Sequence, residues 1–254
     1  MAHEPIPGSA EAVARLRAAG HRVLFVTNNS AATVGEQEAA LDRVGIPAEG
    51  DVVTSAMSGA HVLGAGERVL VCGERGIEEA VARCGALSVS HDDVEGGAAV
   101  DAVVVGFHRH FDYGIMRRAA TAVRSGARLI GTNDDATYPT PLGPIPGGGS
   151  ILAAISTAAG VTPLVTGKPH APMAELVRRL EPRLGADAVM VGDRPSTDGR
   201  FATTLGCRYA LVRSGVTEPG RHPASDPRWF DGCRVDFDVP DLMAVAESVL
   251  SERG

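Results

Sequence analysis

Cysteines are few and dispersed, and long apolar runs are missing. The 254 residues include four cysteines, and no two of them form a C-x-x-C pair. Zinc sites commonly use such pairs, so we expect no zinc and reduced thiols, as is usual in the cytoplasm. No apolar run approaches the roughly 20 residues that a membrane helix needs. No basic region followed by an apolar one opens the chain. We therefore expect a cytoplasmic protein with no membrane partner and no signal peptide.

Basic and aromatic residues are also scarce. Lys and Arg total 24 against 31 Asp and Glu, the net charge is −7, and aromatic residues make up 4% of the chain. No basic stripe stands out, which argues against nucleic acid as a partner. A local pocket can still be positive on an acidic protein, so a small anionic substrate stays open. The hydrophobic content of 44% is enough for one large domain or two small ones.

Apolar runs alternate with helix-like segments along the chain. Strands are predicted at 23–26, 69–72, 101–106 and 128–131 and within AVMVGD and RYALVRSG. Helices are predicted at 9–20, with Ser9 as the N-cap and Gly20 as the stop, and at 76–84, 112–125 and 197–206. Continuous apolar strands between helices indicate an α/β fold with a Rossmann-like parallel sheet covered on both faces.

The middle of the chain has the pattern of a separate α/β unit. It ends in the Pro/Gly-rich stretch YPTPLGPIPGGGS. We predict two domains, a core made of residues 1–56 and 163–254 and an inserted α/β domain at 57–162.

Polar residues follow the predicted strands, where parallel sheets bind their ligands. Thr27, Asn28 and Asn29 come at the end of HRVLFVTNNS, and Lys168 follows a strand in VTGKPHAPM. A hydroxyl and an ammonium can hold the oxygens of a phosphoryl group, where charge builds in the transition state. Each residue also has a structural alternative, with Thr27 as a helix cap and Lys168 as a solvated surface charge.

Two carboxylates follow a further strand. Asp193 ends the apolar run in VMVGDRPSTD, and Asp198 lies five residues further on. A hard divalent ion such as Mg²⁺ prefers oxygen ligands, so the two are candidate metal ligands. Their structural alternative is to cap helix 197–206. The order and spacing of all three motifs favour the functional interpretation over the structural ones.

Eight segments are together more specific than any single residue. They are PIPGSAEAVARLRAAGHRVLFVTNNS, DVVTSA, DAVVVGFHRHFDY, GTNDDATYP, PGGGSILAAI, GKP, VGDRPSTD and LVRSGVT. Through them essentially the whole chain resembles the haloacid dehalogenase superfamily, in the branch of para-nitrophenyl phosphatase-like, phosphoglycolate and glycerol-3-phosphate phosphatases. The resemblance implies that residues 57–162 form a cap that closes over the substrate, and that two copies pair through this cap. It also implies the following roles: catalytic, Thr27 and Lys168; substrate-binding, Asn28 and Asn29; Mg²⁺-binding, Asp193 and Asp198.

One motif of that family is missing. The family's Asp-x-Asp-Gly supplies the nucleophilic aspartate and the acid/base aspartate, just upstream of the segment that matches EPIPGSAEA. Here only three residues precede Glu4, and Asp42 and Asp51 lie in the wrong local context to replace the motif. Either the protein begins upstream of Met1, or the chain is a non-catalytic relative. The roughly five apolar side chains of the strand that carries the motif are worth about 8–15 kcal/mol. A whole domain is stabilised by about 5–15 kcal/mol, which favours an upstream start.

Other clusters carry weaker signals. His108 and His110 have a spacing that suits a metal, but no third ligand lies nearby in the sequence, which favours a strand end in the cap. Asn133, Asp134 and Asp135 are expected in a cap loop that faces the site.

The predicted function is Mg²⁺-dependent hydrolysis of a small phosphate monoester, such as glycerol phosphate or phosphoglycolate, through an aspartyl-phosphate. Because its nucleophile is absent from the chain as written, we expect this chain to be inactive by itself. The alternative is a phosphate-binding or regulatory pseudophosphatase. A third hypothesis is a nucleotide-binding module that uses Gly147–Gly149, with a nucleotide affinity that survives loss of Lys168.

Overall fold

The computed structural model describes residues 5–217 and 232–252, which divide into two compact units. The first unit comprises Val26–Gln37 and Val52–Gly167, and the second comprises the remaining described residues. The division crosses β1 (Phe25–Thr27) and α2 (Val34–Asp42). In the described part of the chain, no helix is long and apolar enough to cross a membrane.

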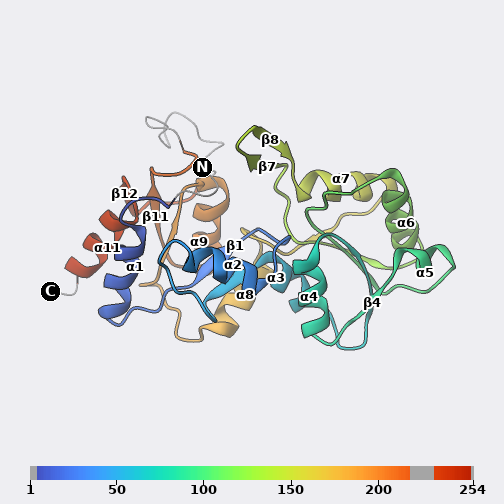
Figure 1. Ribbon diagram of the computed structural model, residues 1–254, viewed down its shortest axis with the longest axis horizontal. Helices are drawn as coiled ribbons and strands as arrows, with labels where there is room; N and C mark the ends of the chain where they lie inside the picture. Colours follow the sequence, from blue (N-terminus) through green and yellow to red (C-terminus); the bar gives the residue numbers. More distant parts are fainter. Residues whose placement is uncertain (1–4, 218–231, 253–254) are drawn as a thin grey trace. The chain divides into compact units, whose positions relative to one another are not determined.

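The first unit is built on a five-stranded parallel sheet (Figure 1). In spatial order its strands are β4 (Leu87–Val89), β3 (Arg68–Cys72), β5 (Ala102–Val105), β6 (Arg128–Gly131) and β9 (Leu164–Val165). Its helices are α3 (Ser55–His61), α4 (Arg75–Arg83), α5 (His91–Glu95), α6 (Tyr113–Arg124) and α7 (Gly148–Ala159). Two further strand pairs are β1 with β2 (Val52–Thr54) and the antiparallel hairpin of β7 (Thr137–Thr140) and β8 (Gly143–Pro146).

The side chains of β5 alternate between the two faces of this sheet, which explains why helices cover both faces. All four residues of β5 are buried. Val103 and Val105 pack in a cluster with Ile155 of α7, whereas Val104 packs in a separate cluster with Ile77 of α4. Successive side chains of a strand point to opposite faces, so a continuous apolar run needs a layer of helices on each side.

The second unit contains a three-stranded parallel sheet. Its strands are, in spatial order, β10 (Val189–Gly192), β11 (Arg208–Val212) and β12 (Phe237–Val239). Its helical elements are α1 (Ser9–Ala18), α8 (Ala171–Leu180), the π-helical turn η1 (Pro195–Gly199), α9 (Arg200–Leu205) and α11 (Leu242–Ser251). Tyr209 and Leu211 pack with Ala202 of α9, and Ala210 between them packs with Val245 of α11. Residues on β11 therefore alternate between two helical layers in the same way as on β5.

The predicted α/β fold with parallel sheets is confirmed. Ser9 is the first residue of α1 rather than its N-cap, because Gly8 takes that position at a φ of 80°. The prediction of a helix at 197–206 is wrong at its start, because η1 precedes α9 and places Asp198 inside a π-helical turn. All of residues 57–162 fall within the first unit together with neighbouring segments, while the limits of an inserted domain stay a prediction.

Candidate functional site

The loop after β1 is fixed by its own polar side chains. Thr27 Oγ1 accepts a hydrogen bond from the backbone N–H of Asn29 at 3.0 Å, and Asn29 Oδ1 accepts one from the N–H of Ala31 at 2.9 Å. Such side-chain-to-backbone bonds replace the strand ladder with two tight turns, which is why the apolar strand stops here. Because Thr27 Oγ1 acts as an acceptor in this bond, its hydroxyl proton is directed elsewhere.

Asn28 is tied to a distant part of the same unit. Its Nδ2 donates to Asp135 Oδ2 at 3.1 Å, and its main-chain oxygen accepts from Asn133 Nδ2 at 2.9 Å and from Ser55 Oγ at 2.8 Å. The structure therefore brings Asn133 and Asp135, which sequence reasoning assigned to a cap loop, onto a predicted substrate-binding residue. Their contacts orient the loop after β1.

Lys168 forms a buried ion pair in the second unit. Its Nζ lies 2.8 Å from Asp198 Oδ1, and the two residues are 8% and 7% exposed. The interpretation of Lys168 as a solvated surface charge is therefore wrong. Two charges removed from water cost several kcal/mol each, so such a pair is kept only where its geometry is good.

Lys168 is also the only lysine of the chain. Of the 24 cationic residues one is Lys and 23 are Arg. Arginine thus carries every other fixed positive side chain, and lysine appears once, at a buried position. Arginine binds as a rigid planar fork, whereas the lysine ammonium is a compact point charge that turns its three donors freely. This signal was available in the composition, and sequence reasoning missed it.

Glycine makes room for the carboxylate of Asp198. A Cβ added at Gly192 would lie 2.4 Å from the Asp198 side chain, a distance that no real contact allows. Asp198 Oδ2 also accepts the backbone N–H of Arg194 at 3.1 Å. The end of β10 and the π-helical turn therefore hold this carboxylate from two sides.

Asp193 is anchored to the segment that follows β11. Its Oδ2 accepts the backbone N–H of Val216 at 2.7 Å, and its main-chain oxygen accepts the hydroxyl of Thr217. A Cβ at Gly215 would lie 2.0 Å from Asp193 Oδ2, so this approach also depends on glycine. An ionised carboxylate accepts at about four lone-pair sites, and the bond from the N–H of Val216 uses only part of that capacity.

The donor set of Asp193 and Asp198 fits Mg²⁺. Both carboxylates follow β10 and are oriented by hydrogen bonds. Mg²⁺ in phosphoryl-transfer sites takes one or two carboxylates and fills its octahedron with waters and phosphate oxygens. Within residues 5–217 and 232–252, no group of three or more His, Cys, Asp or Glu is arranged to hold a metal ion. The two carboxylates therefore suit a metal that completes its shell with water and substrate.

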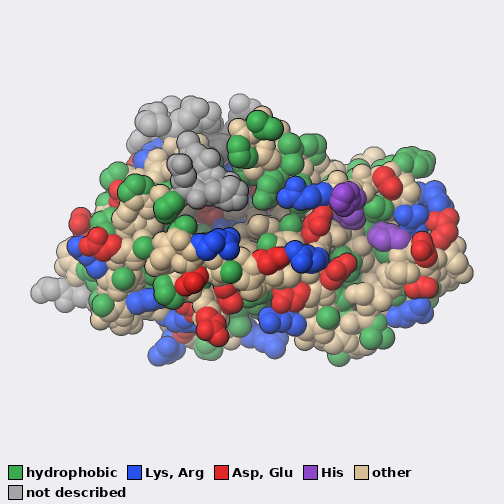
Figure 2. Space-filling view, viewed as in Figure 1, with side chains coloured by type: hydrophobic (Ala, Val, Ile, Leu, Met, Phe, Trp, Pro, Cys, Tyr) green, Lys and Arg blue, Asp and Glu red, His purple; other side chains and the backbone are tan. Residues whose placement is uncertain are grey.

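The histidines singled out in the sequence have local roles. The backbone N–H of His110 donates to His108 Nδ1 at 3.2 Å, and burial lowers the pKa of His108. Figure 2 shows histidine side chains close together on one face of the molecule.

On the same face, acidic and basic side chains are interspersed (Figure 2), a pattern unlike the patch of one charge sign that binds nucleic acid.

The predicted site residues fall into two groups. Thr27, Asn28 and Asn29 belong to the first unit, where they form one hydrogen-bonded loop. The second unit contains the charged residues Lys168, Asp193 and Asp198. Of these, Lys168 and Asp198 are in direct contact.

Two parts of the chain match known protein families. Residues 1–86 match the family described as haloacid dehalogenase-like hydrolase, and residues 165–235 match one described as HAD-hydrolase-like.

Curated and solved proteins are similar over most of the chain. A D-glycerol 3-phosphate phosphatase of Mycobacterium tuberculosis is 38% identical over 87% of this chain, which spans 64% of that protein. The 5'-nucleotidase YutF of Bacillus subtilis is 35% identical, over 85% of this chain and 83% of that protein. A crystal structure of a glycerol phosphate phosphatase from M. tuberculosis in complex with magnesium superimposes with a TM-score of 0.83. Its identity is 33%, over 96% of this chain and 71% of that one.

Proposed function

The chain belongs to the haloacid dehalogenase-like hydrolases, in the p-nitrophenyl phosphatase-like branch, and we propose that it is a Mg²⁺-dependent phosphatase of small phosphate monoesters. Similar proteins include a glycerol phosphate phosphatase, a 5'-nucleotidase and acid sugar phosphatases, and these bear names of phosphate-ester hydrolases. The observation that carries the proposal is the buried Lys168–Asp198 pair, built with the one lysine of the chain.

Lys168 supplies positive charge to the phosphoryl group. An anionic nucleophile and an anionic phosphoryl group repel each other, and a nearby ammonium lowers that repulsion. A unit charge about 4 Å away is worth roughly 4 kcal/mol at an effective dielectric near 20. The bond to Asp198 holds the ammonium in place.

Thr27 and its neighbours bind the phosphoryl oxygens without charge. The hydroxyl of Thr27 donates to a phosphoryl oxygen, while Asn28 and Asn29 orient the group. The turns that fix this loop before substrate arrives support these roles, because preorganised donors need no reordering during reaction.

Asp193 and Asp198 hold the metal. When bound, Mg²⁺ neutralises the charge on the phosphoryl oxygens. The two carboxylates retain their orientation through the backbone N–H groups of Val216 and Arg194.

The nucleophile lies in an Asp-x-Asp-Gly segment that residues 1–254 do not contain. The resemblance implies that its first aspartate attacks phosphorus, that the alcohol leaves, and that water then hydrolyses the aspartyl-phosphate. We expect the chain as written to bind the substrate and to turn it over very poorly. Glycerol phosphate and phosphoglycolate are the proposed substrates.

The direct test uses the chain extended at its N-terminus by a strand that carries Asp-x-Asp-Gly. Phosphate release from glycerol 3-phosphate, phosphoglycolate, a nucleoside monophosphate and p-nitrophenyl phosphate is measured with Mg²⁺ and with a chelator. The proposal predicts hydrolysis that the chelator abolishes and that Asp193→Asn weakens at least about 100-fold at limiting Mg²⁺, since loss of even an outer-shell partner costs about 10–100-fold. Hydrolysis that persists without metal contradicts it.

A non-catalytic relative is the second candidate, favoured by the missing Asp-x-Asp-Gly. Such a protein binds phosphate esters through the same residues and releases no phosphate, even from the extended chain. Measured binding together with zero turnover in the assay above supports this candidate.

We also propose that two copies pair through the cap, as the resemblance implies. The exposed apolar residues of the β7–β8 hairpin, Leu142 at 100% and Ile145 at 37% exposure, support this. Light scattering of the chain and of Leu142→Ser tests it, and a monomer at all concentrations contradicts it.

A further inference from the structure

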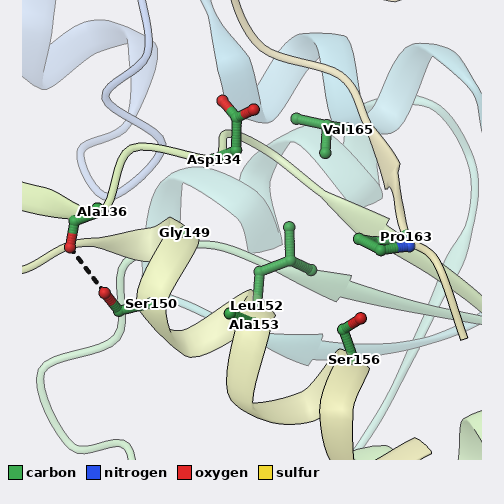
Figure 3. A pocket seen from close by; sticks show the side chains of 9 residues that line it. All are labelled: Asp134, Ala136, Gly149, Ser150, Leu152, Ala153, Ser156, Pro163 and Val165. Atoms are coloured by element: carbon green, nitrogen blue, oxygen red, sulfur yellow. Dashed lines mark hydrogen bonds between the residues drawn. The ribbon is translucent and has the colours of Figure 1, made fainter. Parts of the chain in front are cut away.

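Two features of the described residues have no role in the function proposed above. The first is a cavity of about 430 Å³ in the first unit, with an apolar wall from Leu152, Ala153, Pro163 and Val165 (Figure 3). Ser150 Oγ, also in its wall, donates to the main-chain oxygen of Ala136 at 2.7 Å, so its proton is used within the protein. This wall identifies no ligand class. The second feature is Tyr209 in the second unit, and its contacts lead further.

Tyr209 contacts both ends of the segment that carries the two proposed metal ligands. This segment, the carboxylate loop, comprises residues 192–199 from the last residue of β10 to the last residue of η1, and it includes Asp193 and Asp198. Tyr209 lies on β11, the strand that pairs with β10, and is 1% exposed. Its side chain therefore reaches the carboxylate loop from the neighbouring strand.

The hydroxyl of Tyr209 holds the first end of the carboxylate loop. Tyr209 Oη donates to the main-chain oxygen of Gly192 at 3.2 Å. Burial raises the pKa of Tyr209, and the nearby charges of Asp198 and Asp193 raise it as well, so the hydroxyl keeps its proton and stays a donor. Because Gly192 directly precedes Asp193, the bond fixes the peptide from which that carboxylate projects.

The ring of Tyr209 lies against the second end of the carboxylate loop. A Cβ added at Gly199 would lie 3.0 Å from Tyr209 Cε1 and 2.5 Å from Cys233 Sγ. The lack of a side chain at Gly199 therefore lets the π-helical turn approach the ring. Because Gly199 directly follows Asp198, the ring fixes the position of the second carboxylate in the chain.

Tyr209 is itself held by its main chain. Its N–H donates to Asp236 Oδ2 at 3.0 Å, and its main-chain oxygen accepts the N–H of Asp236 at 2.9 Å. A tyrosine side chain has only two torsion angles and a rigid ring. On a fixed stretch of strand, such a side chain acts as a spacer of constant length between Gly192 and Gly199.

We propose that Tyr209 is a positioning residue for the Mg²⁺ site, an inference that rests on the proposed function. Its hydroxyl and its ring set the two ends of the carboxylate loop, so that Asp193 and Asp198 are presented to one ion. Mg²⁺ demands near-ideal octahedral geometry, and loss of a group that orients a ligand costs about 10–100-fold in metal affinity. A purely structural role for this buried tyrosine predicts a loss of stability and an unchanged affinity for Mg²⁺.

Titration of Mg²⁺ into the full chain tests this without catalysis. The backbone amide NMR signals of Val216 and Arg194 report on the two carboxylates, because their N–H groups donate to Asp193 and Asp198. In the parent chain we expect both signals to shift saturably with one Kd. Tyr209→Phe removes only the hydroxyl and is expected to raise that Kd about tenfold, the lower end for loss of an orienting group. Melting temperatures are measured on the same samples.

Two control variants separate positioning from stability. Val249→Ala trims a buried side chain of α11 that packs in a cluster with Ala210 and Val245. It is expected to lower the melting temperature and to leave the Kd for Mg²⁺ unchanged. Tyr113→Phe removes a hydroxyl from a tyrosine that is 75% exposed, and it is expected to change neither quantity.

The ring signals of the parent chain give a measurement that needs no variant. The chain has three tyrosines, and Mg²⁺ is expected to shift the ring signal of Tyr209 with the Kd of the two amides. If that ring signal stays in place while both amides saturate, the inference is overturned, even if Tyr209→Phe fails to fold. A parental Kd in folded Tyr209→Phe also overturns it, and both results leave the proposed function standing. A parent chain without saturable amide shifts contradicts the proposed function and this inference together.

Discussion

The loop after β1 and the charged pair of Lys168 and Asp198 in the second unit are both polar, and they are stabilised in different ways. In the loop, Thr27 and Asn28 are neutral and make hydrogen bonds to nearby groups. In the second unit, Lys168 and Asp198 form an ion pair and are buried together. A neutral group with a partner costs little to bury, whereas a charge costs several kcal/mol even when paired. Under the proposed function, the neutral loop orients the phosphoryl group, and the buried charge of Lys168 compensates the negative charge of that group.

Neither region contains the nucleophilic aspartate, and supplying it is expected to change activity most. The chain extended by Asp-x-Asp-Gly is expected to exceed the 254-residue chain in kcat by roughly 10⁶, the order of loss when a covalent nucleophile is removed. Phosphate release at saturating Mg²⁺ measures it, with an Asn-x-Asn-Gly extension as the matched control. Robust Mg²⁺-dependent turnover by the shorter chain, abolished by mutation of one of its own residues, shows instead that another nucleophile exists.

Replacement of Lys168 is expected to have the second largest effect on activity. Lys168→Ala in the extended chain is expected to lower kcat/KM about a thousandfold, which is the roughly 4 kcal/mol of charge compensation at about 1.36 kcal/mol per tenfold. Lys168→Arg keeps the charge with a changed donor geometry, so we expect partial activity.

The stability of the Lys168 variants separates charge compensation from folding. Lys168→Ala leaves Asp198 buried without its cation, and such a loss costs about 3–5 kcal/mol. Thermal melts therefore accompany the kinetics. The control is Arg183→Ala, which removes a cation whose side chain is 87% exposed. Near-normal kcat/KM for a folded Lys168→Ala is the result that restricts this lysine to a structural role.

A smaller effect is expected in the neutral loop. Thr27→Val removes the hydroxyl and keeps the shape, and we expect kcat to fall about 100-fold, the lower end for loss of one preorganised donor. Thr27→Ser retains the hydroxyl and is expected to stay within a few-fold of the parent chain. Equal kcat for the Val and Ser variants removes Thr27 from phosphoryl binding.

The smallest effect concerns the pH dependence of stability in the first unit. Burial lowers the pKa of His91 from its ordinary value of 6.5, and Arg118, whose Nε lies 3.4 Å from its Nδ1, lowers it further. The bond to the main-chain oxygen of Val71 and the charge of Asp112 oppose this shift, and His108 nearby adds to it. Because the unfolded chain binds more protons just below 6.5, stability is full above that pH and falls as the pH drops toward the lowered native pKa.

His91→Gln tests this dependence. The variant keeps a hydrogen-bonding group and cannot titrate, so its melting temperature is expected to fall less between about pH 7.5 and about pH 5 than that of the parent chain. A decrease of the same size or larger in His91→Gln rules out His91 as the cause.

Features set by neighbouring residues could be predicted from the sequence, whereas contacts between residues far apart in the sequence could not. Apolar runs such as 101–106 gave correct strands, and polar residues after them gave the candidate site, because both are set by neighbours in the sequence. The bond between Asn28 and Asp135 joins residues 107 positions apart, and the Lys168–Asp198 pair joins residues 30 apart. Such contacts depend on how whole strands and helices pack. The π-helical turn at Asp198 was missed for the same reason, since Gly192 must lie against that carboxylate.

The most direct measurement exploits the single lysine. Selective ¹⁵N-lysine labelling gives one side-chain ammonium signal, that of Lys168, in the chain as it stands. Mg²⁺ with inorganic phosphate is predicted to shift this signal saturably, and Asp193→Asn is predicted to weaken the response. A signal that stays in place while phosphate binds elsewhere in the chain would mean that Lys168 serves Asp198 alone, which contradicts its role in phosphoryl binding.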